Sequence, residues 1–251
     1  MKILETLREK HKQKKKSIAV LVDPDKADDQ GKLLHLINLA NENCIDYFFV
    51  GGSLVTSNLS EVVRTIKENI SLPVVLFPGN AIQIDPSADA ILFLSLISGR
   101  NPELLIGQHV VSAPVLKNTR LEVIPTGYIL INSGRLTSVA YISNTTPIPD
   151  DKYSLAASTA LAGEMLGLQM IYIDAGSGAE KEISPKMISA VRKAVNVPLI
   201  VGGGINTAQK AITALESGAD LIVIGNAIEK DPNLLTEISE KIYEWNKVSD
   251  R

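Results

Sequence analysis

Short apolar runs rich in β-branched residues recur along the 251-residue chain and alternate with segments of helical periodicity. Near-continuous apolar runs are typical of parallel strands that are covered on both faces. The expected strands are residues 18–22, 47–50, 74–77, 90–94, 121–124, 170–173, 199–201 and 221–224. The main helical patterns lie at residues 32–41, 59–68, 102–111, 154–166, 185–194 and 207–217. Eight such units at this length favour an α/β fold closed into one (β/α)8 TIM barrel, with an open doubly wound sheet as the alternative.

Two of the expected units depart from a regular repeat. Only residues 78–88, which include two prolines and a glycine, separate the third strand from the fourth, and this is too short for a crossover helix. We therefore expect an extended segment in place of the third helix. Residues 128–143 contain two strand-like runs around Ser133-Gly134, which predicts a hairpin inserted before the fifth helix. The whole chain, residues 1–251, is expected to form a single barrel domain.

Composition and charge argue against several functional classes. The net charge of -3 provides no large positive field for nucleic acid. The basic run at residues 12–16 is interpreted as a solvated face, with contact to an anionic membrane as the alternative. Cys44 is alone and is expected to be a small buried residue; with no signal-peptide pattern, this predicts a cytoplasmic protein. No apolar run reaches the roughly 18 residues of a membrane span, so only transient membrane contact is expected.

Glycine-rich segments follow the last three expected strands. They are DAGSGA at residues 174–179, GGGIN at 202–206 and GNA at 225–227. Glycine lets the backbone approach an oxyanion closely, and the helix that follows directs free N–H groups at it. These strand ends form the recurrent phosphate site of barrels, so we predict phosphate binding there. The alternative is that the glycines serve only tight turns.

Polar residues also follow the first two strands. Adjacent strands can bring the Asp23 carboxylate and the Ser53 hydroxyl together, and such hard oxygen ligands suit Mg2+ held jointly with substrate phosphates. The alternative for Asp23 is a helix cap. Asp174, beside the glycine-rich segments, is a candidate base or else an acceptor for loop amides. Two phosphate-handling regions at one barrel mouth suggest two phosphorylated substrates.

These strand-end sequences together resemble the geranylgeranylglyceryl phosphate synthase family, in the branch shared by some archaea and bacteria. The similarity runs nearly end to end. It rests on VDPDK at residues 22–26, VGGS at 50–53, LFPGN at 76–80, IPTGYI at 124–129, YIDAGSG at 172–178 and VGGGI at 201–205. The family's fold is a modified barrel without its third helix. The resemblance implies a Mg2+-dependent prenyltransferase of lipid biosynthesis, which joins the prenyl group of geranylgeranyl diphosphate to the 3-hydroxyl of sn-glycerol 1-phosphate.

The resemblance also implies roles for individual residues. Asp23 and Ser53 match the residues associated with Mg2+. The glycerol phosphate site matches Tyr172, Ile173, Asp174, Ala175, Gly176, Ser177, Gly178, Gly203, Gly204, Gly225 and Asn226. The residue that deprotonates the attacking hydroxyl is glutamate in many members and is Asp174 here, shorter by one methylene. Residues 101–107 lack the aromatic residue that several relatives have beside the prenyl groove, so the motif does not fix the donor length. The resemblance also implies a homo-oligomer.

Other functions remain open from the residues alone. A heptaprenylglyceryl phosphate synthase would perform the same reaction with a longer prenyl donor. A sugar-phosphate isomerase or aldolase would share the glycine-rich segments, but the Asp23/Ser53 pair and the lack of a strand-end lysine or histidine argue against it. A non-catalytic phosphate-binding scaffold would have no need of the Asp23 and Asp174 carboxylates. The three histidines, at positions 11, 35 and 109, show neither triad nor zinc spacing and are interpreted as surface or packing residues.

Overall fold

The computed structural model describes residues 2–27, 29–231 and 233–249. Its parallel strands form a closed barrel in sequence order, and the first strand pairs with the eighth. The strands are β1 (Ser17–Val22), β2 (Tyr47–Gly52), β3 (Val74–Pro78), β4 (Ala90–Leu96), β5 (Glu122–Leu130), β6 (Met170–Asp174), β7 (Leu199–Gly202) and β8 (Leu221–Ile224). The predicted TIM barrel is therefore confirmed, and the open-sheet alternative is wrong.

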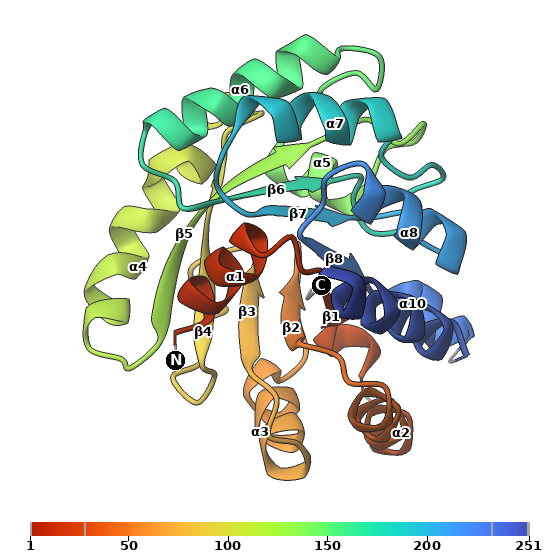
Figure 1. The fold of residues 1–251 in the computed structure, drawn as a ribbon. Coiled ribbons are helices and arrows are strands. Elements are labelled where there is room, and N and C mark those ends of the chain that lie inside the picture. The colour runs from red at the N-terminus through yellow and green to blue at the C-terminus, as the bar shows by residue number, and fades with distance from the viewer. Residues whose placement is uncertain (1, 28, 232, 250–251) are drawn as a thin grey trace.

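Helices surround this barrel (Figure 1). The outer helices are α2 (Gln30–Glu42), α3 (Leu59–Asn69), α4 (Gln108–Lys117), α6 (Tyr153–Met165), α7 (Pro185–Ala194), α8 (Ala208–Glu216) and α10 (Asn233–Ser249). Shorter elements are the 3-10 helix η1 (Pro24–Lys26), the π-helical turn η2 (Glu103–Gly107), α5 (Ser138–Ser143) and α9 (Asn226–Lys230).

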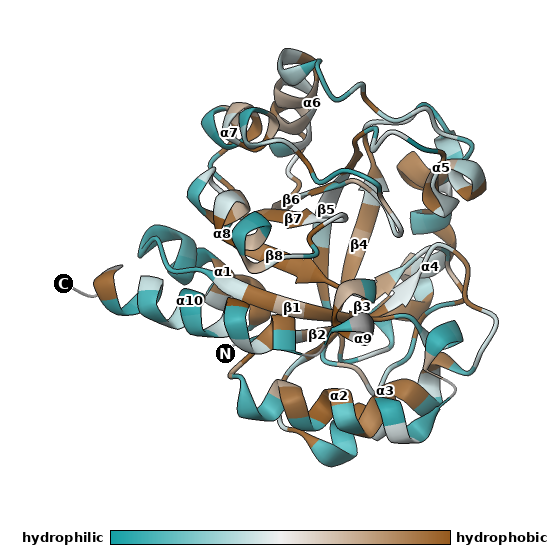
Figure 2. Cartoon of the chain, turned by 90° about the vertical axis from the view of Figure 1, so that its right-hand side faces the viewer, coloured by the Kyte–Doolittle hydropathy of each residue, from teal (hydrophilic) through white to brown (hydrophobic). Residues whose placement is uncertain are grey.

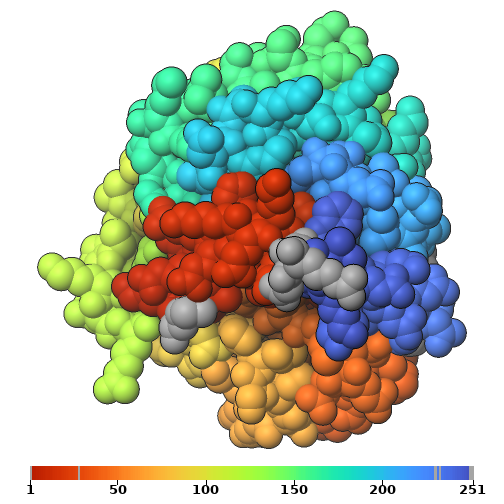
Figure 3. Space-filling model, in the orientation of Figure 1, coloured from red at the N-terminus to blue at the C-terminus, as the bar shows by residue number. Residues whose placement is uncertain are grey.

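The N-terminal helix α1 (Ile3–Lys12) lies across one end of the barrel, in the centre of the face shown in Figures 1 and 3. Its side chains Ile3 and Leu7 pack with the residues of the barrel interior. The backbone N–H of Ile3 donates to the carboxylate of Glu122, at the start of β5. Because α1 covers the end at which the strands begin, the open mouth is at their C-terminal ends.

Side chains alternate along each strand between two cores, as the two-residue period of a strand requires. On β6, Tyr172 faces the barrel interior, whereas Ile171 and Ile173 pack in the layer between strands and helices. Figure 2 shows the result, with hydrophobic strands enclosed by helices that carry hydrophilic residues on their outer faces. The same alternation directs Asp174, the last residue of β6, into the mouth.

Residues 79–89, between β3 and β4, form bends and turns rather than the expected extended segment, and no helix stands between α3 and α4 (Figure 1). The side chain of Gln83 is buried and fixes this segment. Its Oε1 accepts the N–H of Gly79 at 3.1 Å, and its Nε2 donates to the carbonyl of Gly52 at 3.1 Å. The segment is thereby tied to the C-terminal end of β2.

The hairpin predicted within residues 128–143 is wrong. Strand β5 continues to Leu130, and the second apolar run forms α5 instead of a strand. Both edges of β5 are already paired, with β4 and β6, so a further strand would find no free edge in the closed barrel. The sequence also ended the fifth strand too early, because Pro125 interrupts its pattern while the strand continues through it.

Two predictions for single residues are also wrong. Cys44 is exposed, because it occupies the turn between α2 and β2 with a positive φ of 50°. Lys16, at the end of the basic run, is buried rather than solvated. Its Nζ donates to the carbonyl of Ala219 at 2.7 Å and lies 5.3 Å from the ring centroid of Trp245, on α10. Burial lowers the pKa of Lys16.

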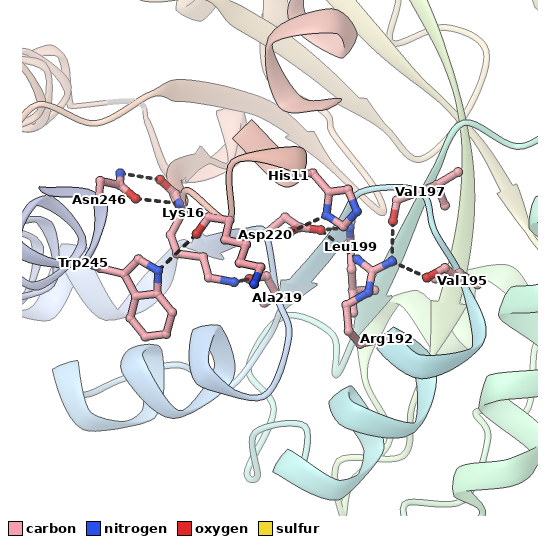
Figure 4. A network of polar contacts seen from close by, with 11 residues as sticks. His11, Lys16, Arg192, Val195, Val197, Leu199, Ala219, Asp220, Trp245 and Asn246 are labelled. Atoms are coloured by element: carbon pink, nitrogen blue, oxygen red, sulfur yellow. Dashed lines mark hydrogen bonds and ion pairs between the residues drawn. The ribbon is translucent and has the colours of Figure 1, made fainter. Parts of the chain in front are cut away.

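Asp220 organises the polar network at this end of the barrel (Figure 4). Its carboxylate is buried and lies 2.9 Å from His11 Nδ1. It also accepts hydrogen bonds from the guanidinium of Arg192 at 2.9 Å and from the N–H of Leu199 at 2.8 Å. Three separate elements, α1, α7 and β7, are therefore held together by one side chain.

We expect Asp220→Ala to lower the free energy of unfolding by about 3 kcal/mol, because removing one partner of a buried ion pair leaves the other charge uncompensated. Denaturant unfolding measures this. Asp151→Ala is the matched control, since Asp151 forms an exposed pair with Lys152 and its loss should change little. Equal unfolding midpoints for the two variants would contradict the assigned role of Asp220.

Candidate active site

The mouth of the barrel brings the Asp23 carboxylate beside the end of β2. A Cβ atom on Gly52 would lie 3.8 Å from Asp23 Oδ1, and Ser53 is the next residue. Asp23 Oδ1 also accepts the N–H of Asp25 at 3.2 Å and so caps η1. The capping interpretation is therefore correct: the cap occupies Oδ1, while Oδ2 lies 3.5 Å from Lys26 Nζ and keeps a lone pair for a metal contact.

Asp25 fastens the end of β1 to the loop after β2. Its Oδ1 accepts the N–H groups of Thr56 at 2.8 Å and of Ser57 at 2.7 Å. The hydrogen bond from the Ser57 N–H is the main cause of a lowered pKa for the Asp25 carboxyl. This contact keeps the segments that contain Asp23 and Ser53 adjacent to one another.

Asp174 is buried at the end of β6. It accepts a hydrogen bond from the hydroxyl of Tyr128 at 2.5 Å, and its Oδ1 accepts the N–H of Gly176 at 2.9 Å. Burial raises the pKa of the Asp174 carboxyl, and the hydrogen bond from Tyr128 offsets part of that rise. The residue is thus an acceptor for a loop amide, as the alternative interpretation predicted. A carboxylate has further lone pairs, so this contact does not prevent it from accepting a proton.

The glycine-rich segments after β6, β7 and β8 meet at one place. The Nδ2 of Asn226 donates to the Oγ of Ser177 at 3.2 Å, which joins the segments after β8 and β6. Gly203 and Gly204 have positive φ values of 78° and 71°. A Cβ atom on Gly203 would lie 2.7 Å from Asp174 Oδ1, so the glycine permits the close approach of these two segments.

Two residues predicted for this site have side chains that point elsewhere. Ile173 and Ala175 are buried in the layer between strands and helices, so any contact with a ligand would come from their backbone groups. Tyr172 faces the interior, where a Cβ atom on Gly202 would lie 2.4 Å from its hydroxyl. The tyrosine hydroxyl therefore lies directly beneath the segment after β7.

We expect Gly203→Ala to weaken the binding of a phosphorylated ligand, since the new methyl group would collide with Asp174 and displace the loop. Gly167→Ala is a matched control, because Gly167 also has a positive φ, of 90°, but nothing lies within 4 Å of its Cβ position. Calorimetric titration with sn-glycerol 1-phosphate compares the two. Similar loss of binding in both variants would attribute the effect to backbone strain alone.

A largely apolar groove of about 310 Å³ opens beside these residues. Ser53 and Tyr128 lie among its lining residues, and it continues between residues 79–89 and α4. Its apolar lining consists of Phe77, Pro78, Ala81, Ile84, Ile91, Leu92, Phe93, Leu94, Leu96, Leu104, Val139 and Ile142. Since the N–H of Ala81 donates to the Oε1 of Gln108 at 3.1 Å, the two walls are joined.

His109 lies in the wall of this groove rather than at the surface, so it is a packing residue. Its ring and that of Phe93 form a T-shaped pair with centroids 4.5 Å apart, and its side chain is buried. Burial lowers the pKa of the imidazole. A neutral ring is compatible with the apolar lining.

Sequence reasoning missed two residues of the site, Tyr128, which donates to Asp174, and Lys26. Lys26 follows the end of β1 by four positions, and its ammonium lies at the mouth, 3.5 Å from Asp23 Oδ2 and 2.5 Å from Asn226 Oδ1. The expectation that no strand-end lysine exists was therefore wrong. The signal that could have found it is its place in the motif VDPDK, in which Asp23 had already been singled out.

Within the described residues, no group of three or more His, Cys, Asp or Glu side chains is arranged to hold a metal ion. Mg2+ is commonly held by one or two carboxylates together with substrate phosphates, and the Asp23 carboxylate beside the Ser53 segment suits such a shared site. In the same part of the chain, no helix is both long enough and apolar enough to cross a membrane.

Comparison with known proteins agrees with this geometry. Residues 10–242 match the model of the PcrB family. The geranylgeranylglyceryl phosphate synthase of Spirosoma linguale is 56% identical over 93% of this chain and 94% of its own length, and that of Chitinophaga pinensis is 54% identical over 91% of this chain and 90% of its own.

A solved structure is similar throughout. It is (S)-3-O-geranylgeranylglyceryl phosphate synthase of Thermoplasma acidophilum in complex with sn-glycerol-1-phosphate, with a TM-score of 0.90, 32% identity, and coverage of 97% of this chain and 99% of that one. The closed eight-stranded barrel and the glycine-rich segments at its mouth agree with these similarities. Because the family model matches residues 10–242 and the relatives are similar over most of the chain, this protein belongs to the PcrB family.

Proposed function

We propose that this protein is a prenyltransferase that forms an ether bond between sn-glycerol 1-phosphate and geranylgeranyl diphosphate. The 3-hydroxyl oxygen of the glycerol attacks the first carbon of the prenyl chain, and the bond from that carbon to the diphosphate breaks. The hydroxyl proton passes to Asp174, and diphosphate leaves. Residues 1–251 act as one catalytic domain in this proposal.

The observation that supports the reaction most directly is the position of Tyr128. Its side chain lines the apolar groove, and its hydroxyl donates to Asp174. The groove suits the prenyl chain, and Asp174 lies next to the glycine-rich segments that suit the glycerol phosphate. The proposed base is therefore one hydrogen bond away from the groove, where the first carbon of the donor and the hydroxyl of the acceptor would have to meet.

The acceptor site of the proposal consists of Tyr172 to Gly178 with Gly203, Gly204, Gly225 and Asn226. The glycine-rich segments after β6 and β8 are joined there by Asn226 and Ser177, and glycines of the segments after β6 and β7 have positive φ, which suits a phosphate that approaches the backbone closely. The relative from Thermoplasma acidophilum has sn-glycerol-1-phosphate bound, which supports the same acceptor here. A sugar-phosphate isomerase or aldolase would have no use for the apolar groove.

Asp23 and Ser53 are proposed to hold Mg2+ at the side of the mouth where the groove begins. The metal, when bound, neutralises negative charge on the departing diphosphate. Asp23 contributes one carboxylate oxygen, since the other caps η1, and Asp25 keeps the loop of Ser53 close to it.

The groove lies beside residues 79–89, and in this proposal these bends and turns replace the third helix of a regular barrel so that the prenyl chain can leave the barrel sideways. The experiment that tests the function is incubation with sn-glycerol 1-phosphate, Mg2+ and prenyl diphosphates of graded length, with products identified by mass. We expect the geranylgeranyl ether of glycerol phosphate. A preference for heptaprenyl diphosphate would reassign the donor, and no ether product from any donor would overturn the proposal.

A homo-oligomer is part of the proposal as well. Apolar side chains on and beside α4 are exposed, among them Ile106, Val110 and Val111. A second copy would remove this apolar surface from water. Light scattering after size exclusion measures the mass of the assembly.

The same exposed apolar side chains could provide the transient membrane contact expected from the sequence. Sedimentation with anionic vesicles would detect it.

A further inference from the structure

Lys26 lies in a chain of contacts that crosses the mouth of the barrel. Its Nζ is 3.5 Å from Asp23 Oδ2 and donates to Asn226 Oδ1 at 2.5 Å. Asn226 in turn donates to Ser177 Oγ at 3.2 Å. The chain joins the proposed metal residue after β1 to the glycine-rich segments after β8 and β6, which in the proposed function hold different substrates.

We propose that the Lys26 ammonium is a shared binding group, which lies between the diphosphate of the donor and the phosphate of the acceptor and makes their simultaneous binding possible. This inference rests on the proposed function. An ammonium is a compact charge with three hydrogen-bond donors, so it can contact Asn226 and two anionic groups at once. Its side chain is 39% exposed, so the ammonium can reorient toward ligands that enter the mouth.

Negative charge gathers at the mouth when both substrates are bound, so a cation between them would reduce the repulsion. Both substrates are phosphorylated, and Asp23 and Asp174 add negative charge on either side of them. Like charges at short range repel strongly where water is partly excluded. Lys210, on the helix α8 that follows β7, is already paired with Glu182 at 3.0 Å. Arg135 lies beside the proposed acceptor site, with its Nη2 3.3 Å from the Cβ position of Gly178.

The position of Lys26 follows from local structure. The backbone after β1 forms the short helix η1, begun by Pro24 and capped by the Asp23 side chain. Lys26 is the last residue of η1, so this single turn brings its side chain back toward Asp23 as an i,i+3 pair. The single turn η1 therefore places both the Asp23 carboxylate that caps it and the Lys26 ammonium proposed to lie between the two substrates.

The test is a calorimetric titration of sn-glycerol 1-phosphate into the protein, with and without saturating Mg2+ and inorganic diphosphate. In Lys26→Gln we expect the affinity for sn-glycerol 1-phosphate to fall in both conditions, and to fall by about tenfold more when diphosphate is present than when it is absent. A tenfold difference is the order of magnitude expected when one charge that couples two binding sites is removed. Lys26→Arg should restore most of this difference because it retains the charge. Lys67→Gln is the matched control, since Lys67 is a similarly exposed lysine paired with Asp89 at 2.6 Å, away from the mouth.

If the unaltered protein binds both ligands and Lys26→Gln loses the same factor with and without diphosphate, Lys26 serves one substrate only and the bridging role is wrong. Equal behaviour of Lys26→Gln and Lys67→Gln would also overturn it. If the unaltered protein binds neither ligand, the proposed function fails, and this inference fails with it.

Discussion

Asp174→Asn should reduce turnover by roughly 10² to 10⁴, the usual range for removal of a general base, while both substrates still bind. Asparagine keeps the size of the side chain and can still accept the N–H of Gly176, so the loop after β6 should keep its shape. What it loses is the ability to take the proton of the glycerol hydroxyl. Steady-state kinetics at saturating substrate measures the loss. Near-normal turnover would reduce Asp174 to a loop acceptor and leave water or the departing diphosphate to accept the proton.

The pH profile separates these two roles further. The base acts only when deprotonated, and burial raises the pKa of Asp174, so activity should rise with pH through a value above the ordinary aspartate range. The hydrogen bond from Tyr128 stabilises the charged carboxylate and lowers that pKa. Tyr128→Phe should therefore move the acidic limb of kcat/KM to higher pH. An unmoved limb in Tyr128→Phe would show that another group controls it.

Asp23→Asn should lower turnover on the order of 10³-fold, because metal neutralisation of the leaving group is worth several kcal/mol. The fold should survive, since the asparagine oxygen can still accept the N–H of Asp25 and cap η1. The measurement is turnover as a function of Mg2+ concentration. We expect half-maximal activity to require more Mg2+ in the variant.

Ser53→Ala serves as a graded comparison for the metal site, since a neutral hydroxyl ligand contributes less than a carboxylate and its loss should cost less. Thermal unfolding of both variants verifies that the barrel is intact. Full activity in a strong chelator, or in Asp23→Asn, would remove the metal role from this side of the mouth.

The sequence predicted the barrel well because parallel strands buried on both faces leave an uninterrupted apolar signal, and eight such signals constrain the closure. It failed where the signal depends on neighbours in space. The run that forms α5 has strand-like composition, but the closed barrel has no edge for it. Lys16 belongs to a basic run, yet its burial depends on Trp245, more than two hundred residues away.

The candidate site shows the same division. The glycine-rich segments and Asp23 were predictable because each follows a strand within the chain itself. The contacts of Tyr128 with Asp174 and of Lys26 with Asn226 were not, because they join residues from different strands and depend on side-chain reach across the mouth. The family, predicted from its motifs, is confirmed by the match over residues 10–242.

The segment of residues 79–89 has an evolutionary consequence. In the proposed function the prenyl tail lies between this segment and α4, in a groove lined both by outward-facing side chains of β4 such as Ile91 and by interior side chains such as Tyr128. Changes in the segment or on the facing side of α4 would then lengthen or shorten the accepted tail while Asp174 and the glycine-rich segments, which do not line the groove, keep their positions. Donor preference can diverge among relatives while the chemistry at the mouth stays the same.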